Sequence, residues 1–414
     1  MRRLLLILSL TLLSASFAGA ANWPNWRGPT GTGFTSEADF PDRWSSTDGI
    51  RWRLKLPSAG NSTPIVWGDR VFLTQSIDLE GTRRAVLCVD RKSGKLLWQQ
   101  ETPFAGAEAT HKDNPFCSAS PVTDGTRVIA WHGSAGVVCY DFQGKLLWRR
   151  DLGEFQHIWG NASSPILYRD TVILNCGPGE RQFLVALDRR TGKEVWRVDE
   201  PGGRFGKNNA EWLGSWSTPT LLRVGDRDEL LVSWPDTLKA YNPENGKLLW
   251  HCAGLTKLVY TSVVATPEVA VAMSGYGGAA IAVRPGGSGD ATPRRLWREE
   301  QNRQRIGSGV IVGEHFYLVN EPGTFQCIEL KTGKTVFDER LGGATWASLV
   351  GAGDRLYATS MRGETFILGA KPEFTLIARC ALEERTLATP ALANGEIFIR
   401  THANLYCIAG VPKR

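Results

Sequence analysis

The stretch Gly94-Lys95-Leu96-Leu97-Trp98 decides the fold, because its pattern Gly-Lys-x-x-Trp returns along the chain. Further copies, the last with Phe in place of Trp, occupy residues 144–148, 192–196, 246–250 and 333–337. A spacing of roughly 40–55 residues, with short apolar runs and polar turns between the copies, is typical of a β-propeller. In such a fold each repeat forms one four-stranded blade.

Each repeat carries the signals of four strands. A polar Ser/Thr pair and often a proline open the first strand, as at Ser62-Thr63-Pro64. Proline suits that position because it lacks a backbone donor. The third strand ends in an acidic residue or Asn, and a short turn then leads to the glycine of the repeat, as from Asp90 to Gly94. Asp can bond the turn backbone and Gly tolerates a positive φ, so a tight turn into the fourth strand is predicted.

The last repeat lacks its outer strand, and the missing strand is found at the other end of the chain. We count eight repeats, and residues 49–54, which include Trp52, have the pattern of an outer strand without a blade. We predict an all-β, eight-bladed propeller of four-stranded antiparallel blades, in which this N-terminal strand completes the last blade and protects its edge. The predicted parts are a signal peptide (1–20), an extension (21–48), the propeller (49–410) and a tail (411–414).

A large aromatic ring recurs at one position of the outer strand. Such a ring is expected to pack against the next blade, since burying a large apolar side chain contributes roughly 1.5–3 kcal/mol. We assign this structural docking role to Trp52, Trp98, Trp148, Trp196, Trp250 and Trp297.

The chain begins with the features of a secretory signal. Arg2 and Arg3 precede an apolar run at 4–13 that is too short to span a bilayer, and the small residues 18–20 suit cleavage. No cysteine lies near that point, so no lipid anchor is expected, and no later stretch predicts a membrane helix. We expect a protein of the periplasm or the extracellular space, as a monomer or within a hetero-complex.

Charge and cysteine usage exclude several classes. The formal net charge is +6 without any Lys/Arg-rich run, so nucleic acid is not an expected partner. Equivalent positions of different blades are too far apart for a disulfide, which favours buried free thiols at those positions. For Cys117 and Cys176, which lie at other positions, a disulfide remains an alternative. The cysteines that share one repeat position are Cys88, Cys139, Cys327 and Cys407.

The repeats resemble the pyrroloquinoline-quinone (PQQ)-like propeller repeats over residues ~50–410, and residues 186–196 carry the pattern best. That superfamily includes the quinoprotein alcohol dehydrogenases and BamB, the propeller lipoprotein of the outer-membrane β-barrel assembly machinery. The resemblance therefore implies the propeller fold and two possible roles, enzyme or scaffold. Residues 23–29 also look like the opening of secreted propellers of this group, and we interpret them as a clip packed across the propeller.

The longer links between blades are predicted to rim one face of the ring. They are rich in His, Asn, Trp and Arg, and loops on a rigid scaffold are where binding usually occurs. A rim of solvated polar turns is the alternative interpretation. The candidate ligand residues are His111, Lys112, Asn114, His157, Trp159, Asn161, Asn209, Glu211, Trp212, Arg303, Arg305 and Arg385.

The enzyme role implied by the resemblance requires PQQ between a tryptophan and a disulfide of adjacent cysteines, Ca²⁺ on Glu, Asn and Asp, and an Asp base. The chain has no Cys-Cys pair and no compact acidic cluster for a hard cation. Asp113 and Glu211 cannot be given metal or base roles by spacing, and the histidines show no metal-ligand pattern. We therefore predict no catalytic residue, no metal ligand and no cofactor.

The sequence favours a non-catalytic binding or scaffold propeller of the cell envelope that recognises a protein or an extended peptide. The resemblance to BamB implies the same role. One alternative is a PQQ- and Ca²⁺-dependent quinoprotein oxidoreductase. Another is a glycan-binding propeller that uses the rim residues Trp159, Trp212 and Trp346.

Overall fold

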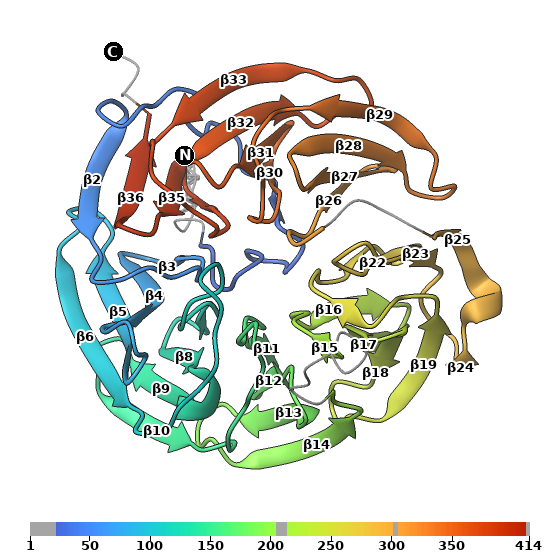
Figure 1. Cartoon of the computed structure of the whole chain (residues 1–414), viewed down its shortest axis with the longest axis horizontal. Coiled ribbons are helices and arrows are strands. Elements are labelled where there is room, and N and C mark those ends of the chain that lie inside the picture. Colours follow the sequence, from blue (N-terminus) through green and yellow to red (C-terminus); the bar gives the residue numbers. More distant parts are fainter. Residues whose placement is uncertain (1–21, 204–212, 301–304, 411–414) are drawn as a thin grey trace, which may run out of the picture.

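The computed structural model describes residues 22–203, 213–300 and 305–410. They form a ring of eight small antiparallel sheets around a central axis (Figure 1). The predicted eight-bladed propeller is thereby confirmed.

The first four blades follow one another around the ring, each running outward from the axis. Blade 1 contains β3 (Ile65–Trp67), β4 (Arg70–Ser76), β5 (Arg83–Asp90) and β6 (Leu96–Pro103). Blade 2 contains β7 (Val122–Thr123), β8 (Arg127–Trp131), β9 (Val137–Asp141) and β10 (Leu146–Arg150), with the 3-10 turn Gly133–Ala135 between β8 and β9. Blade 3 contains β11 (Ile166–Tyr168), β12 (Thr171–Cys176), β13 (Gln182–Asp188) and β14 (Glu194–Glu200). Blade 4 contains β16 (Thr220–Val224), β17 (Arg227–Trp234), β18 (Thr237–Tyr241) and β19 (Leu248–Ala253).

The other four blades complete the ring. Two of the eight sheets are extended by one short additional strand each. Blade 5 contains β21 (Val264–Ala265), β22 (Ala270–Met273), β23 (Ala280–Val283) and β25 (Arg295–Glu299), with the 3-10 turn Thr292–Arg294 before β25. Blade 6 contains β26 (Val310–Val312), β27 (His315–Asn320), β28 (Thr324–Glu329) and β29 (Thr335–Arg340). Blade 7 contains β30 (Val350–Ala352), β31 (Arg355–Thr359), β32 (Glu364–Gly369) and β33 (Leu376–Ala381). Blade 8 contains β34 (Ala391–Ala393), β35 (Glu396–Arg400), β36 (Asn404–Ala409) and, from the other end of the chain, β2 (Ile50–Lys55). The additional strands are β1 (Phe34–Thr35) beside β30, β24 (Gly289–Asp290) beside β19, and the pair β15 (Gly214–Ser215) and β20 (Leu258–Val259).

The ring closes through β2, as the sequence predicts. β2 pairs antiparallel with β36, and Trp52 lies opposite Cys407. Arg91 of blade 1 bonds Glu396 of blade 8 at 2.5 Å, and Arg51 of β2 pairs with the same buried carboxylate. Hydrogen bonds and ion pairs therefore join the first and last blades where the chain would otherwise end in an open edge.

The glycine and the tryptophan of the repeat interlock between neighbouring blades. Trp52 Nε1 donates to the carbonyl of Arg91 at 2.8 Å, and a Cβ on Gly94 would lie 2.5 Å from the Trp52 ring. The glycine is therefore needed for close approach as well as for its φ of 70°. The same bond to the following blade is made by Trp98 (Phe142 O, 2.9 Å), Trp148 (Arg189 O, 3.0 Å), Trp196 (Pro243 O, 3.1 Å) and Trp297 (Leu330 O, 2.9 Å).

Trp250 departs from this pattern. Its indole N–H donates to Glu229 Oε2 of its own blade at 2.8 Å, and the amide of Gly286 bonds the same oxygen at 3.3 Å. The glycine-rich insertion of blade 5 lies against this tryptophan, since β24 pairs with β19 at Trp250. The irregular repeat thus replaces the usual docking contact with a buried carboxylate.

A belt of Ser and Thr hydroxyls links the blades near the axis. In each link the backbone N–H of one blade donates to the hydroxyl of the next, as from Thr63 to Ser120 at 2.8 Å. Thr63 Oγ1 itself is buried without a partner among the described residues, at the seam between blades 8 and 1. The belt continues with N–O distances of 2.8–3.0 Å through Ser164, Thr218, Ser262, Ser308, Ser348 and Thr389.

Cysteine state and membrane topology can be stated for the described residues. All eight cysteines are buried and free, so Cys117 and Cys176 form no bridge. Within these residues no helix has the length and apolar character to cross a membrane. The predicted signal peptide (1–20) and tail (411–414) lie outside the described residues.

Candidate functional site

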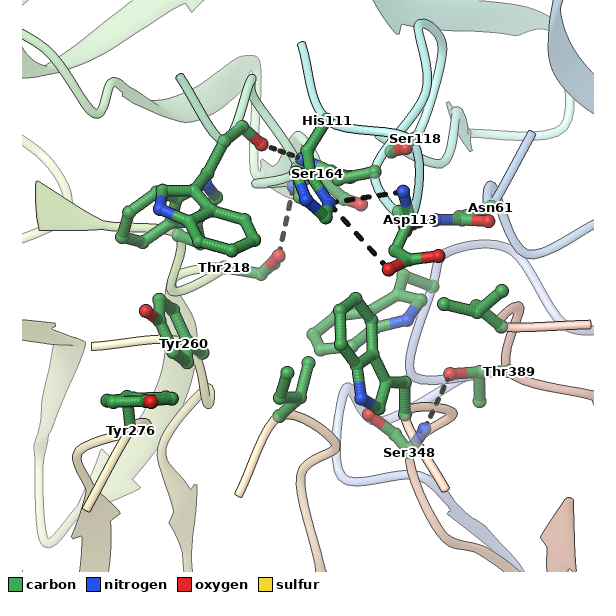
Figure 2. Close-up of a pocket in the computed structure, with 18 residues that line it drawn as sticks. Asn61, His111, Asp113, Ser118, Ser164, Thr218, Tyr260, Tyr276, Ser348 and Thr389 are labelled. Atoms are coloured by element: carbon green, nitrogen blue, oxygen red, sulfur yellow. Dashed lines mark hydrogen bonds and ion pairs between the residues drawn. The ribbon is translucent and has the colours of Figure 1, made fainter. Parts of the chain in front are cut away.

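A cavity of about 260 Å³ lies on the axis of the ring (Figure 2). Its wall takes one residue from each blade, always two positions before the belt residue of that blade. The first strands are the innermost strands, so residues just before them converge on the axis. The eight wall residues are Asn61, Ser118, Ala162, Trp216, Tyr260, Ile306, Trp346 and Leu387.

The cavity has an aromatic side. The Trp216 and Tyr260 rings meet edge to face at 5.0 Å between centroids, and the Trp216 indole is fixed by a 2.8 Å bond to Gly160 O. Trp346 Nε1 bonds Glu321 at 3.0 Å. Trp159, from the link into blade 3, packs at a tilted angle against His111, with 4.2 Å between the ring centroids. These partners fix the rings in place, so the cavity presents rigid aromatic faces to a ligand.

The polar part of the cavity centres on Asp113. Arg385 Nη2 bonds Asp113 Oδ1 at 2.5 Å, and Asn61 Nδ2 bonds the Asp113 carbonyl at 2.9 Å. Asp113 Oδ2 makes no hydrogen bond within the described part of the chain, and His111 Nδ1 lies 3.8 Å from it. His111 Nδ1 accepts the Asp113 amide at 3.2 Å, so a neutral His111 ring carries its proton on Nε2. Among the described residues, one oxygen of this carboxylate is thus left without a hydrogen-bond donor.

The cavity also offers unused hydrogen-bond donors. The belt hydroxyls of Ser164, Thr218, Ser348 and Thr389 line it, and each already accepts a backbone N–H. Their own protons have no acceptor among the described residues, and Trp159 Nε1 is also buried without a partner. A hydroxyl can donate while it accepts. The cavity therefore suits a ligand that is rich in acceptor atoms.

His157 supports the cavity from behind. It is 2% exposed and packs edge to face on Trp216 at 4.9 Å, and its Nδ1 accepts the Trp159 amide at 3.2 Å. Burial lowers the pKa of His157 to about 4 and that of His132 to about 3. Both rings are therefore neutral in the folded protein at neutral pH.

Acid is expected to destabilise the protein through these histidines. The folded-state pKa of His157 lies below the ordinary value of 6.5, so the unfolded chain binds more protons as the pH falls from 6.5 toward 4. The free energy of unfolding should drop by about 2.5 kcal/mol at pH 4.5 from His157 alone. Urea unfolding of wild type and His157→Gln at pH 7 and 4.5 checks this, because Gln cannot titrate. An equal loss of stability in both proteins would contradict the assignment.

The structure brings together some of the residues predicted for the rim. His111, Asn114 and Trp159 line the cavity, and Arg385 reaches it through Asp113. Asn161 bonds Glu108 at 3.1 Å behind the wall, and Lys112 is exposed. Arg305 is buried elsewhere, against Asn320 and Glu299. The predicted residues Asn209, Glu211, Trp212 and Arg303 lie outside the described residues.

Sequence reasoning missed most of the wall. The candidates predicted from the long links do not include Trp216, Tyr260 and Ile306. A signal was available, since each wall residue stands at a fixed offset before the Ser or Thr that opens the first strand. Reading that single column of the repeat would have predicted the ring.

The fold and the repeat define an eight-bladed propeller of the PQQ-like class with a cavity on its axis. The chain belongs to the family whose model is described as outer membrane protein assembly factor BamB, which matches residues 43–114 and 82–339. The predicted family is thereby confirmed.

Two curated relatives match parts of the chain. A 1-butanol dehydrogenase (quinone) of Thauera butanivorans is 27% identical over 164 residues, which are 36% of this chain and 24% of that protein. A polyvinylalcohol dehydrogenase of a Pseudomonas species is 24% identical over 235 residues, 49% of this chain and 35% of that protein. The chain thus spans about a quarter and about a third of the length of these relatives.

Solved structures share the fold at low sequence identity. A europium-containing methanol dehydrogenase superposes with a TM-score of 0.71 at 10% identity, covering 94% of this chain and 98% of the other. The quinohemoprotein alcohol dehydrogenase of Comamonas testosteroni gives 0.72 at 11%, covering 95% and 81%. BamB from Moraxella catarrhalis gives 0.61 at 12%, covering 87% and 99%.

The predictions of a non-catalytic scaffold, of no enzyme activity and of no cofactor are wrong. Both relatives matched by sequence are named as dehydrogenases, and one of them is named as a quinone enzyme. The physical reason for the error is that we looked for local motifs, a cysteine pair and an acidic cluster. The wall instead takes single residues from all eight blades, so its pattern is a fixed position in each repeat and not a cluster of neighbouring residues.

The residues around the cavity fit a quinone but not a metal ion. Rigid aromatic faces suit a flat ring, and the free donors, Trp159 Nε1 among them, suit its oxygen atoms. Among the described residues that line the cavity, Asp113 is the only acidic one, and Arg385 pairs with it. The described residues contain no group of three or more His, Cys, Asp or Glu side chains placed to hold a metal. A hard cation prefers six or more oxygen ligands, which the described residues of the cavity do not supply, so the reaction proposed for this cavity contains no metal ion.

Proposed function

We propose that the protein is an oxidoreductase of the quinoprotein type that oxidises an alcohol in the axial cavity. The observation that carries the proposal is the pairing of an aromatic wall with one free carboxylate oxygen, Asp113 Oδ2, inside the same cavity. The names of the two sequence relatives support the reaction class. The chain spans only part of those relatives, so the alcohol itself is part of the proposal.

In the proposed reaction the chain positions the reactants and moves one proton. When bound, a quinone such as PQQ would take up the hydrogen of the alcohol's C–H bond together with two electrons, so that the alcohol carbon becomes a carbonyl. Asp113 Oδ2 accepts the hydroxyl proton of the alcohol, while Arg385 holds Oδ1 and fixes the orientation of the carboxylate. Trp216, Tyr260 and Trp346 bind the flat ring and exclude water from it.

We also propose a cellular setting for the protein. The signal predicted at residues 1–20 supports action outside the cytoplasm, in the periplasm or beyond. The family model is described as an assembly factor, which supports contact with a protein of the cell envelope. Co-purification from envelope extracts at 0.5 M salt, roughly the strength that removes loose ionic contacts, tests the partner.

The activity is tested by dye-linked oxidation with PQQ added to the purified protein. Methanol, 1-butanol and polyvinyl alcohol serve as substrates, because the similar proteins are named for them. Dye reduction that needs both PQQ and an alcohol is the expected result. Lys112→Ala is a matched control on the same link, because Lys112 is exposed and absent from the cavity wall, and should keep full activity. No PQQ-dependent turnover with any of the three alcohols would contradict the proposal.

A further inference from the structure

The segment before the propeller crosses the axis of the ring. Trp23 pairs with Val66 of blade 1 through two backbone bonds of 2.9 Å, and Pro24 O accepts the Thr123 amide of blade 2 at 3.0 Å. Arg27 Nη1 donates to Leu349 O of blade 7 at 2.8 Å, and Nη2 donates to Gly309 O of blade 6. Blades 2 and 6 are opposite each other in an eight-bladed ring. The chain therefore traverses the axis between Pro24 and Arg27, where Figure 1 draws the N-terminal segment near the centre.

Trp26 occupies this crossing point and lines the cavity. Val66 is the second residue of β3, and Thr123 is the last residue of β7. Each of these first strands follows an inter-blade link, and the link into β7 carries His111 and Asp113. The first strands run away from those links, so these anchors lie toward the other end of the channel. Trp26 therefore approaches the cavity from the end opposite the links.

The segment is held in place by a buried cation. Arg27 is 4% exposed, and three backbone carbonyls accept from its guanidinium, the third being Thr32 O at 2.8 Å. A Cβ on Gly33 would lie 2.3 Å from the Arg27 guanidinium carbon, so this glycine is needed for the approach. Beyond it, β1 adds in parallel to β30 of blade 7. Buried charge-assisted bonds of this kind are strong, so the crossing is a fixed part of the structure.

We infer that residues 22–37 close one end of the axial channel and supply Trp26 as a stacking surface for a planar ligand. The identity of that ligand as a quinone rests on the proposed function. The contact between Trp26 and the ligand is a separate claim, because it follows from the path of the chain. Ligand then enters and leaves on the side of the inter-blade links.

Two probes separate these claims. PQQ is titrated against the protein directly, and 8-anilinonaphthalene-1-sulfonate, a fluorescent aromatic dye, reports any flat apolar ligand that the cavity accepts. The variants are Trp26→Ala, Trp26→Phe and Trp67→Ala, the last as a matched control. Trp67 is the final residue of β3 in the same part of blade 1 and is absent from the cavity wall.

Removing the Trp26 ring should raise the Kd of both probes about tenfold or more, which is the scale expected for a lost aromatic contact. Trp26→Phe should recover most of the affinity, and Trp67→Ala should bind within about twofold of wild type, since it removes no ligand contact. Thermal unfolding of each variant confirms that it is folded.

The outcomes decide both claims. Equal affinities of wild type and Trp26→Ala for both probes would overturn the inference. Dye binding that is lost in Trp26→Ala, without competition from PQQ, would support Trp26 as the stacking surface and overturn the quinone. Failure of the wild type to bind either probe would overturn both.

Discussion

Replacing Asp113 with Asn is expected to slow PQQ-dependent alcohol oxidation at least about a hundredfold, the lower end of what a positioned general base contributes. Asn keeps the size of the side chain but cannot accept the proton that Asp113 Oδ2 is placed to take. Steady-state dye reduction at saturating alcohol measures the effect. The Kd for PQQ should change much less, because the aromatic wall is untouched.

The loss must be separated from misfolding. The ion pair of Asp113 with Arg385 involves an arginine that is 45% exposed, so breaking it should cost no more than about 1 kcal/mol of stability. Asp69→Asn is the matched control, since Asp69 is 77% exposed, pairs with Arg70 and lies outside the cavity wall. An Asp113→Asn rate within threefold of the control would remove Asp113 from the mechanism.

Deleting residues 49–56 is expected to leave the protein without a cooperative fold. The deletion removes β2, the outer strand of blade 8, and leaves β36 as an open edge. It also removes the buried Trp52, and substitution of a buried tryptophan by Ala alone costs about 3–5 kcal/mol. Total stabilities are typically about 5–15 kcal/mol, so the combined loss should exceed what the ring can tolerate.

The deletion is best judged beside two single substitutions. In urea, Trp52→Ala should unfold at a clearly lower concentration than wild type. Lys55→Ala, an exposed position on the same strand, should change the free energy of unfolding by less than about 0.5 kcal/mol. A soluble deletion variant with a single sharp unfolding transition would show that β2 does not close the ring.

The architecture could be predicted from the sequence because the same strand and turn pattern recurs in every repeat. The spacing of Gly94 and its equivalents set the blades, and the orphan strand around Trp52 identified the closure. Both signals are local in the chain. The close contact between each glycine and the tryptophan of the preceding blade could not be predicted from the sequence, because the two residues, such as Gly94 and Trp52, belong to different repeats.

The candidate site could be predicted only in part, because its residues come from different repeats. His111, Asn114 and Trp159 stand in conspicuous links and were selected. Trp26 reaches the axis through the path of the N-terminal segment, which the sequence does not show. Trp216 stands in the repeat column two positions before Thr218, outside the links from which the candidates were taken. The weight placed on a missing cysteine pair then led the functional interpretation toward a scaffold, although a cavity of different composition lies at the axis.

If the axial cavity is a quinone site, a calorimetric titration of the purified protein with PQQ will detect the bound quinone. We expect one PQQ bound per chain with micromolar or tighter affinity, which is a binding free energy of roughly 8 kcal/mol or more. It also predicts that Ala162→Trp abolishes binding, because a large ring at that wall position would fill the cavity. No binding to wild type, or equal binding to wild type and a folded Ala162→Trp variant, would contradict the claim.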